Sequence, residues 1–404
     1  MKKFVSVICL LALVSLLLSL PVSAAGEAES TGVTINVYNW GEYIANGEDG
    51  TMDINREFEK RTGIKVNYTT FDSNETMYTK IKGGGVSYDV IIPSDYMVEK
   101  MIAEGLVQEL NFDNIPNYQY IDESLRTEPY YDPSGKYSVP YTWGTTCLIY
   151  NTKQVTEPVD SWDMLWNEKY KGKILMFDNP RDAFGIAQFK NGFSLNTTDE
   201  NELKQCEESL KEQKQLADTV YEMDQTIEKM ANGSAYIAPY YVGDAVRMYD
   251  SNPDLKIVFP KEGVNKYVDA MCIPTGAKHK AEAEAYINFL CDPEIAYENM
   301  LYVAYASPVT QAAERHKQDI AADYGEEWVD VFYPPESVKT EGFIKLPDET
   351  NRMMDEMWAS IKTWHGGGSN TLVIVLVVVL FVVLAGGVIL LRVRKKRRER
   401  ELDE

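Results

Sequence analysis

Two hydrophobic periods alternate along residues 33–103 of the chain. Val33, Ile35 and Val37 are separated by polar residues, which predicts a half-buried strand, and spacings of three and four residues further on predict helices. The pattern predicts strands at 33–37, 64–68 and 88–92 and helices at 52–61, 76–82 and 96–103. Glycines follow the helical segments, as expected of residues that adopt the left-handed conformation at helix ends. Such a series is typical of a parallel sheet covered by helices.

A second series of strands and helices follows an extended stretch over 137–150. Strands are predicted near 173–177, 235–238 and 255–259, with helices between them that include the acidic segment 199–216. Another extended stretch, 266–273, leads into a predicted helix at 281–290 that resembles a return to the first domain. We therefore predict two α/β lobes joined by two crossing strands, with a hinge and a cleft. The predicted boundaries are 33–143 with a return segment at about 271–330 for lobe 1, 144–270 for lobe 2, and helices at about 336–364 packing back on lobe 2.

Both ends of the chain indicate where it works. Residues 1–25 have the basic start, the apolar run and the small residues of a secretory signal peptide. The segment 371–391 carries no charge and, at about 1.5 Å per residue, spans roughly 30 Å, the thickness of a hydrocarbon core. A glycine-rich tether at 365–370 precedes it, and a basic tail at 392–404 follows, which places the tail in the cytoplasm. We predict a single-pass membrane protein whose binding domain is extracellular.

Composition excludes several classes of function. The formal net charge is −22, and the portion outside the membrane is more acidic still, so its surface repels nucleic acid and attracts cations. The sequence contains no phosphate-binding loop, so nucleotide hydrolysis would belong to another chain. Four exterior cysteines lack the spacing of a disulfide framework or a zinc site. The histidines, His279, His316 and His365, lie in polar surroundings, and we expect solvated side chains there rather than metal ligands or general bases.

Acidic residues stand beside aromatic residues at three points where strand-like runs end or meet a glycine. The three segments are Trp40-Gly41-Glu42-Tyr43, Tyr240-Tyr241-Val242-Gly243-Asp244 and Tyr267-Val268-Asp269. A carboxylate binds an ammonium group through charge and hydrogen bonds, and an aromatic face binds it through its quadrupole and covers the alkyl stem. Together they suit an organic cation, and an α,ω-diamine best. Two other interpretations stay open: surface acids beside core aromatics, and the paired carboxylates of a glycoside hydrolase.

Candidate residues also follow the predicted strands directly. Residues 40–43 follow the first strand, 94–96 follow the third, and 178–182 follow a strand of the second lobe. Ligands of open α/β sheets bind outside the carboxyl ends of the strands. We therefore expect all three groups to face one cleft.

Longer motifs carry a family resemblance over about 33–307. They are Tyr38-Asn39-Trp40-Gly41-Glu42-Tyr43, Ser73-Asn74-Glu75-Thr76-Met77-Tyr78, Tyr88-Asp89-Val90-Ile91-Ile92-Pro93-Ser94-Asp95-Tyr96, Val139-Pro140-Tyr141-Thr142-Trp143-Gly144, Ser161-Trp162, Lys171-Gly172, Pro260-Lys261-Glu262-Gly263 and Ile273-Pro274. Taken together and in this order, they resemble the bacterial spermidine/putrescine-binding proteins, which are extracytoplasmic receptors of polyamine ABC transporters. The resemblance implies a type II, two-lobed periplasmic-binding-protein-like α/β fold, here followed by one C-terminal transmembrane helix.

The resemblance also implies a set of ligand-binding residues. They are Trp40, Glu42, Tyr43, Ser94 and Tyr96 from lobe 1, Asp182, Tyr241 and Asp244 from lobe 2, Tyr267 and Asp269 near a crossing strand, and Tyr305 near the end of the match. In this reading Glu42, Asp182 and Asp269 neutralise amines while the rings stack on methylenes and cations. Tyr241 and Tyr267 stand where the family often has Trp.

Ligand length depends on two further positions. Asn179 stands where spermidine-binding members have Asp, and Asp244 resembles the putrescine-binding members. The implied function is capture of a polyamine without catalysis, cofactor or metal, and delivery to permease subunits with a separate cytoplasmic ATPase. A membrane-tethered glycosidase and a receptor for another organic cation remain as alternatives.

Overall fold

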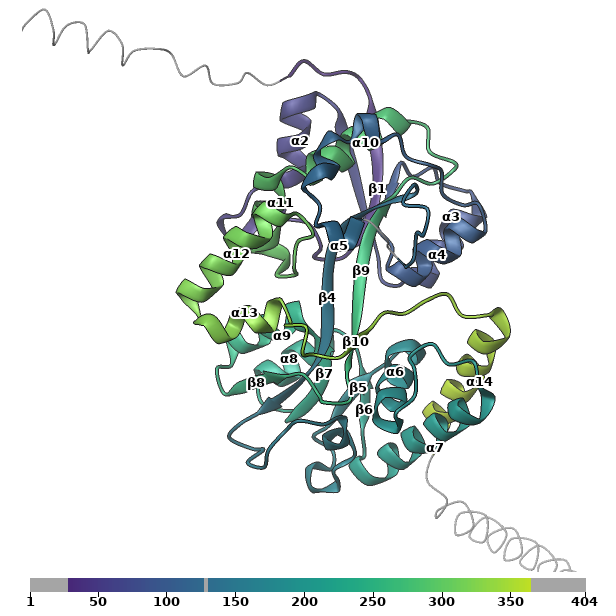
Figure 1. The fold of residues 1–404 in the computed structure, drawn as a ribbon, viewed down its shortest axis with the longest axis vertical. Helices are drawn as coiled ribbons and strands as arrows, with labels where there is room; N and C mark the ends of the chain where they lie inside the picture. Colours follow the sequence, from purple (N-terminus) through teal and green to yellow (C-terminus); the bar gives the residue numbers. More distant parts are fainter. Residues whose placement is uncertain (1–27, 127–129, 365–404) are drawn as a thin grey trace, which may run out of the picture. The chain divides into compact units, whose positions relative to one another are not determined.

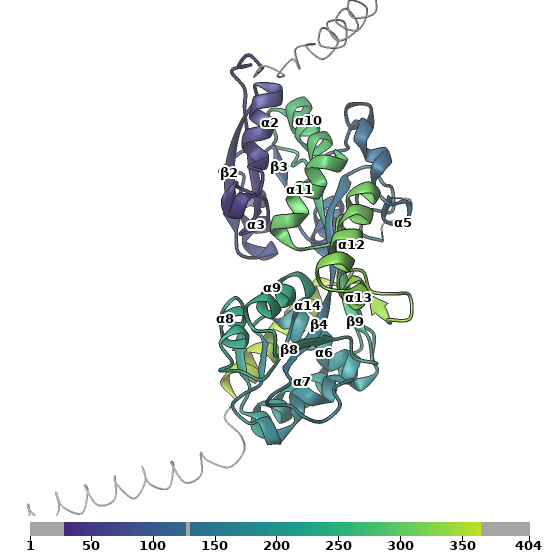
Figure 2. The ribbon, with the colours of Figure 1, turned by 90° about the vertical axis from the view of Figure 1, so that its left-hand side faces the viewer.

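The structure is a computed structural model that describes residues 28–126 and 130–364 (Figures 1 and 2). The predicted signal peptide, tether, membrane span and basic tail lie outside the described residues. Within the described residues, no helix is both long and apolar enough to cross a bilayer. The chain divides into two compact units. Unit 1 runs to Thr142 and includes Val268–Val303 and Ser307–Asp319, whereas unit 2 comprises Trp143–Tyr267, Ala304–Ala306 and the chain from Ile320 onward.

Parallel strands form the sheet of unit 1, as predicted. Strand β1 pairs in parallel with both β2 and β3, and the end of β9 joins antiparallel where Ile91 meets Cys272. The bounds are Thr34–Trp40 for β1, Lys65–Phe71 for β2, Val90–Ile91 for β3 and Val264–Cys272 for β9. Because β1 and β3 run in the same direction, Trp40, the last residue of β1, and Ser94, which follows β3, lie at the same edge of the sheet.

Helices cover this sheet and bury its apolar residues. The helices of unit 1 are α2 at Ile54–Thr62, α3 at Asn74–Gly83, α4 at Asp95–Ala103, α5 at Glu123–Arg126, α10 at Lys280–Leu290, α11 at Pro293–Val303 and most of α12 at Thr310–Asp323, with 3-10 turns at Glu48–Gly50, Phe112–Asn114 and Pro116–Tyr120. The ring of Phe58 in α2 lies 5.0 Å from that of Tyr286 in α10, and both side chains are fully buried. The helix predicted at 281–290 therefore belongs to the first unit, which it reaches through β9.

Capping residues account for the helix starts that the hydrophobic period misplaced. Helix α3 begins at Asn74 rather than at residue 76, because Ser73 precedes it in an extended conformation and its Oγ accepts a hydrogen bond from the Thr76 amide at 3.2 Å. Helix α4 begins at Asp95, directly after Ser94. The Ser94 side chain makes no capping hydrogen bond to α4, whereas the start of α3 fixed by Ser73 places Asn74 at the candidate site.

Unit 2 contains an antiparallel sheet and a short parallel pair. Strand β4 pairs antiparallel with β7 and β8, β5 pairs in parallel with β6, and β10 pairs in parallel with β9. The bounds are Ser138–Asn151 for β4, Leu175–Phe177 for β5, Val220–Glu222 for β6, Ile237–Tyr241 for β7, Leu255–Val258 for β8 and Thr340–Glu341 for β10. Strands β4 and β9 each begin in one unit and end in the other, as the two predicted crossing strands do.

Helices of unit 2 pack on each other as well as on its strands. They are α6 at Pro180–Asn191, α7 at Glu200–Ala217, α8 at Gln225–Ala231, α9 at Val242–Ser251, α13 at Glu326–Phe332 and α14 at Asp348–Thr363, with 3-10 turns at Trp162–Trp166 and Glu168–Tyr170. Figure 1 shows α14 lying along α7. Its Lys362 forms an ion pair with Asp178, which lies between β5 and α6.

Candidate functional site

A buried carboxylate lies at the centre of the candidate residues of unit 1. Asp269 is 5% exposed, and its Oδ2 accepts a hydrogen bond from the Tyr43 hydroxyl at 2.6 Å. That hydroxyl also lies 2.6 Å from Thr142 Oγ1, and Ser94 forms a β-bridge with Asp269. Burial raises the pKa of Asp269 to about 6, although the hydroxyls of Tyr43 and Ser94 lower it. The structure therefore joins three of the predicted residues directly.

A set of buried hydrogen bonds holds the loop that carries Tyr43. Tyr141 donates its hydroxyl to the Tyr43 carbonyl at 2.5 Å, and Asn299 donates to the Tyr141 hydroxyl at 2.8 Å. The other end of the Asn299 amide accepts from the Ala45 backbone at 2.9 Å. In the same loop, directly before Tyr43, Glu42 adopts a left-handed conformation with φ of 53°, which is uncommon for a residue other than glycine. The loop conformation is thus determined by residues from distant parts of the chain.

The other two residues of this loop bond elsewhere in unit 1. Glu42 is exposed, and its Oε2 accepts a hydrogen bond from the Tyr302 hydroxyl at 2.5 Å. The Trp40 ring lies 4.5 Å from that of Phe71, and its Nε1 is buried without a hydrogen-bond partner. Neither residue contacts Asp269 through a hydrogen bond.

Asn74 organises the remaining predicted residues of unit 1. Its Nδ2 lies 3.1 Å from Ser94 Oγ and 3.1 Å from the Tyr96 hydroxyl, and its Oδ1 accepts from the Ser94 amide. The Tyr96 hydroxyl donates to Glu75 at 3.0 Å. Asn74 belongs to a motif that resembles the family, but the sequence alone assigns it no role. Its position directly after Ser73, a typical N-cap residue, is the sequence feature that could have indicated one.

A second buried carboxylate, missed from the sequence, stands next to the first. Asp95 is fully buried, and its oxygens accept from the Tyr96 amide at 2.7 Å, the Val268 amide at 3.2 Å and the Tyr130 hydroxyl. Burial raises the pKa of Asp95 to about 7, and the charge of Asp269 adds to the rise. In the described part of the chain, neither carboxylate forms an ion pair with a Lys or Arg.

Unit 2 links its five predicted residues by direct contacts. The Tyr241 hydroxyl donates to Asp182 Oδ2 at 2.8 Å, and the Tyr305 hydroxyl donates to Asp244 Oδ2 at 2.6 Å. The centroid of the Tyr267 ring lies 5.5 Å from that of Tyr241 and 6.3 Å from that of Tyr305. We call these five residues the tyrosine row, after the chain of contacts that runs from Asp182 through the three rings to Asp244.

Helix starts position both carboxylates of the tyrosine row. Asn179 is the N-cap of α6, and it accepts from the Asp182 amide at 2.8 Å and donates to the Asp182 carboxylate at 2.7 Å. Asp244 lies in the first turn of α9, where the helix dipole favours a negative charge. Burial nevertheless raises the pKa of Asp244, while the Tyr305 hydroxyl and the charge of Arg247 lower it.

Two glycines allow the rings to approach the backbone. A Cβ atom at Gly144 would lie 2.6 Å from the Tyr267 hydroxyl oxygen, and one at Gly243 would lie 2.7 Å from the Ala304 carbonyl and 3.0 Å from the Tyr305 ring. Real Cβ atoms essentially never approach other atoms so closely, so a side chain at either position would displace a ring of the row.

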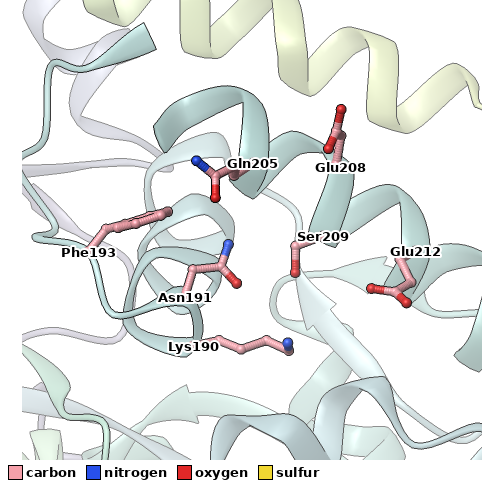
Figure 3. A pocket seen from close by; sticks show the side chains of 7 residues that line it. All are labelled: Lys190, Asn191, Phe193, Gln205, Glu208, Ser209 and Glu212. Atoms are coloured by element: carbon pink, nitrogen blue, oxygen red, sulfur yellow. The ribbon is translucent and has the colours of Figure 1, made fainter. Parts of the chain in front are cut away.

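A hollow elsewhere in unit 2 is lined by other residues. It is open, has a volume of about 600 Å³ and lies between the end of α6 and α7 (Figure 3). Its lining is Lys190, Asn191, Phe193, Gln205, Glu208, Ser209 and Glu212. None of the predicted site residues belongs to it.

The expectation for the histidines was wrong at one position. His316 is 7% exposed, and burial lowers its pKa to about 4, so it is a buried neutral side chain rather than a solvated one. Its helix, α12, turns that residue inward, which the polar neighbours did not reveal. In the described part of the chain, Cys147, Cys206, Cys272 and Cys291 are buried free thiols, and no cluster of potential metal ligands is present.

Comparison with known proteins identifies the family. The model of the bacterial extracellular solute-binding protein family matches residues 54–325. The spermidine/putrescine-binding periplasmic protein of Salmonella typhimurium is 34% identical over 310 residues, which cover 76% of this chain and 86% of that protein. The chain belongs to the bacterial extracellular solute-binding proteins. Another relative in this family, the putrescine-binding periplasmic protein SpuD of Pseudomonas aeruginosa, is 31% identical over 369 residues, covering 86% of this chain and 97% of that protein.

Solved structures agree with this family. The spermidine/putrescine ABC transporter substrate-binding protein PotD of Streptococcus pneumoniae has a TM-score of 0.71 and 33% sequence identity, covering 82% of this chain and 98% of that chain. The predicted two-lobed, periplasmic-binding-protein-like α/β fold and the resemblance to spermidine/putrescine-binding proteins are therefore confirmed. The relatives are solute-binding receptors and not enzymes, so a glycoside hydrolase has no support among them.

Proposed function

We propose that this solute-binding protein is a membrane-anchored extracellular receptor for putrescine or spermidine. It would deliver the polyamine to the permease of an ABC transporter whose ATPase is a separate cytoplasmic chain. The observation that carries the proposal is the tyrosine row, because two carboxylates separated by aromatic rings match a molecule with an ammonium group at each end and methylenes between.

The carboxylate pair of unit 1 supports the same chemistry. Asp95 and Asp269 are both buried without a Lys or Arg partner in the described residues, and an uncompensated buried charge is costly. A bound ammonium group would supply the missing positive charge. We propose Asp269 of unit 1 and the tyrosine row of unit 2 as polyamine-binding groups.

Ligand length remains part of the proposal. The Asn179 side chain is a neutral amide, so it offers no full charge to a third ammonium group. Both ends of this amide are also already bonded to Asp182. The carboxylate of Asp244, at the other end of the tyrosine row, stands at a position where the chain resembles the putrescine-binding members. We therefore propose that putrescine binds at least as tightly as spermidine.

Calorimetry of the full-length protein against a series of amines tests this function. We expect micromolar or tighter binding of putrescine, because several desolvated charge and cation–π contacts of about 0.5–2 kcal/mol each act together. A quaternary amine serves as the control for other organic cations. The absence of heat with every polyamine, combined with hydrolysis of a chromogenic glycoside, would establish the enzymatic alternative. A tenfold preference for spermidine would contradict only the proposal on length.

The membrane anchor rests on the sequence of residues 371–404. The uncharged segment 371–391 followed by seven basic residues predicts an anchor with a cytoplasmic tail. Protease added to intact cells should therefore remove the binding domain, whereas an antibody against the tail should bind only after permeabilisation. Binding of that antibody to intact cells would reverse the orientation and contradict the receptor model.

A further inference from the structure

Two buried carboxylates in contact with the same strand suggest a role for a proton in ligand capture. Asp95 Oδ2 accepts from the amide of Val268, the residue directly before Asp269. In the segment between β3 and α4, Ser94 directly precedes Asp95 and forms the isolated β-bridge to Asp269. Two like charges held this close in a dry interior repel each other, so the pair favours holding one proton.

We propose that Asp95 is a positioning residue that couples polyamine binding to proton release: the Asp95–Asp269 pair holds a proton when the site is free and loses it to solvent when an ammonium group binds. This inference rests on the proposed function, because it requires a cationic ligand at Asp269. The proton leaves as the ammonium charge arrives, so the net charge of the pair with its proton or its ammonium partner is the same in both states.

The titratable groups around the pair are mostly tyrosines. From the segment after α5, Tyr130 donates its hydroxyl to Asp95, and the Tyr131 ring is buried nearby. From the loop after β1, Tyr43 donates to Asp269, and from β4 Tyr141 interacts electrostatically with it. Burial raises the pKa values of Tyr130, Tyr131 and Tyr141 well above their ordinary value, so they stay protonated at neutral pH. Only the two carboxylates of this group titrate near neutrality, with pKa values raised to about 7 and about 6.

The sign of the pH dependence follows from these shifts. Below the pKa of the free site, binding must first remove a proton, so affinity falls by up to about tenfold per pH unit for each proton released. Stability of the free protein changes in the opposite direction. A carboxyl group whose folded pKa is raised binds protons more tightly when folded, so the free protein gains stability as pH falls from about 7 toward the ordinary Asp pKa of 3.8.

Calorimetry of the full-length protein with putrescine from pH 8 to pH 5, in buffers of different ionisation enthalpy, tests the inference. We expect uptake of a proton by the buffer on binding near pH 6 and about a hundredfold weaker affinity at pH 5 than at pH 8, since pH 5 lies two units below the raised pKa of Asp95. Spermidine serves as the probe if it binds more tightly. Failure of every polyamine to bind at any pH would overturn the proposed function. Tight binding with a pH-independent Kd and no proton release would overturn this inference alone.

Two variants should move the pH profile in opposite directions. Asp95→Asn removes the carboxyl group with the higher pKa and leaves Asp269, whose pKa is raised to about 6, so the loss of affinity between pH 8 and pH 5 should shrink to about tenfold. Tyr130→Phe removes a hydrogen bond that favours the charged form of Asp95, so the loss should begin at higher pH. Tyr78→Phe, which removes a tyrosine hydroxyl from the exposed Glu104, is the matched control and should leave the profile unchanged. A purely structural role for Asp95 would change affinity equally at all pH values, and that result in both variants would contradict the proposal.

Discussion

Replacement of Asp269 by Asn should weaken polyamine binding by more than about tenfold, since a hydrogen bond to a charged group is worth roughly 1.5–3 kcal/mol. The carboxylate is 5% exposed and receives the Tyr43 hydroxyl, which an Asn carbonyl can still accept. A buried ammonium group would therefore lose its charge partner while its desolvation cost stays the same. Calorimetry at pH 8, where Asp269 is ionised, measures the change.

A matched control separates a local contact from general attraction by an acidic protein. Glu208 lies exposed on α7, so Glu208→Gln changes the net charge equally and should leave the Kd nearly unchanged. Thermal unfolding provides a second check. Removal of a buried carboxylate with a raised pKa should not destabilise the free protein at neutral pH. Equal losses of affinity in the two variants would mean that surface charge, rather than Asp269, attracts the ligand.

The double substitution Asp182→Asn with Asp244→Asn should have the largest effect, a loss of affinity of about a hundredfold or more. Both carboxylates accept a tyrosine hydroxyl at the ends of the tyrosine row, and Asn retains an oxygen for that bond. The rings should therefore keep their arrangement while both charges disappear. Calorimetry with putrescine measures the loss, and circular dichroism checks that the fold is retained.

The control for the double substitution is Glu208→Gln with Glu212→Gln. These residues carry the same charge on exposed positions of the same unit, and they line the open hollow rather than the tyrosine row (Figure 3). We expect less than about a twofold change in Kd, because charges on the surface are screened by salt. If the control variant lost affinity and the variant of the tyrosine row did not, the ligand would lie in the hollow, and the proposed site would be contradicted.

Local sequence patterns determined the order of the elements and most of their types. Alternating apolar residues mark β1, and glycine at position 63 ends α2, because these signals depend only on neighbouring residues. The same holds for the three segments that join an acid to an aromatic. Family motifs singled out Ser94 and Asp182 among the residues that follow predicted strands, and they added Tyr305.

Only tertiary structure decided which of these residues meet and how each is charged. Asp95 looked like an ordinary residue at a helix start, but folding places it against Val268 and beside Asp269, far away in the sequence. The same is true of His316, whose polar neighbours concealed its burial. A pKa depends on desolvation and on charges brought together in space, and neither is encoded in adjacent positions of the chain. The sequence by itself therefore determined the family and suggested the proposed binding chemistry, whereas the folded structure decided the arrangement of the tyrosine row and the pairing of the two buried carboxylates.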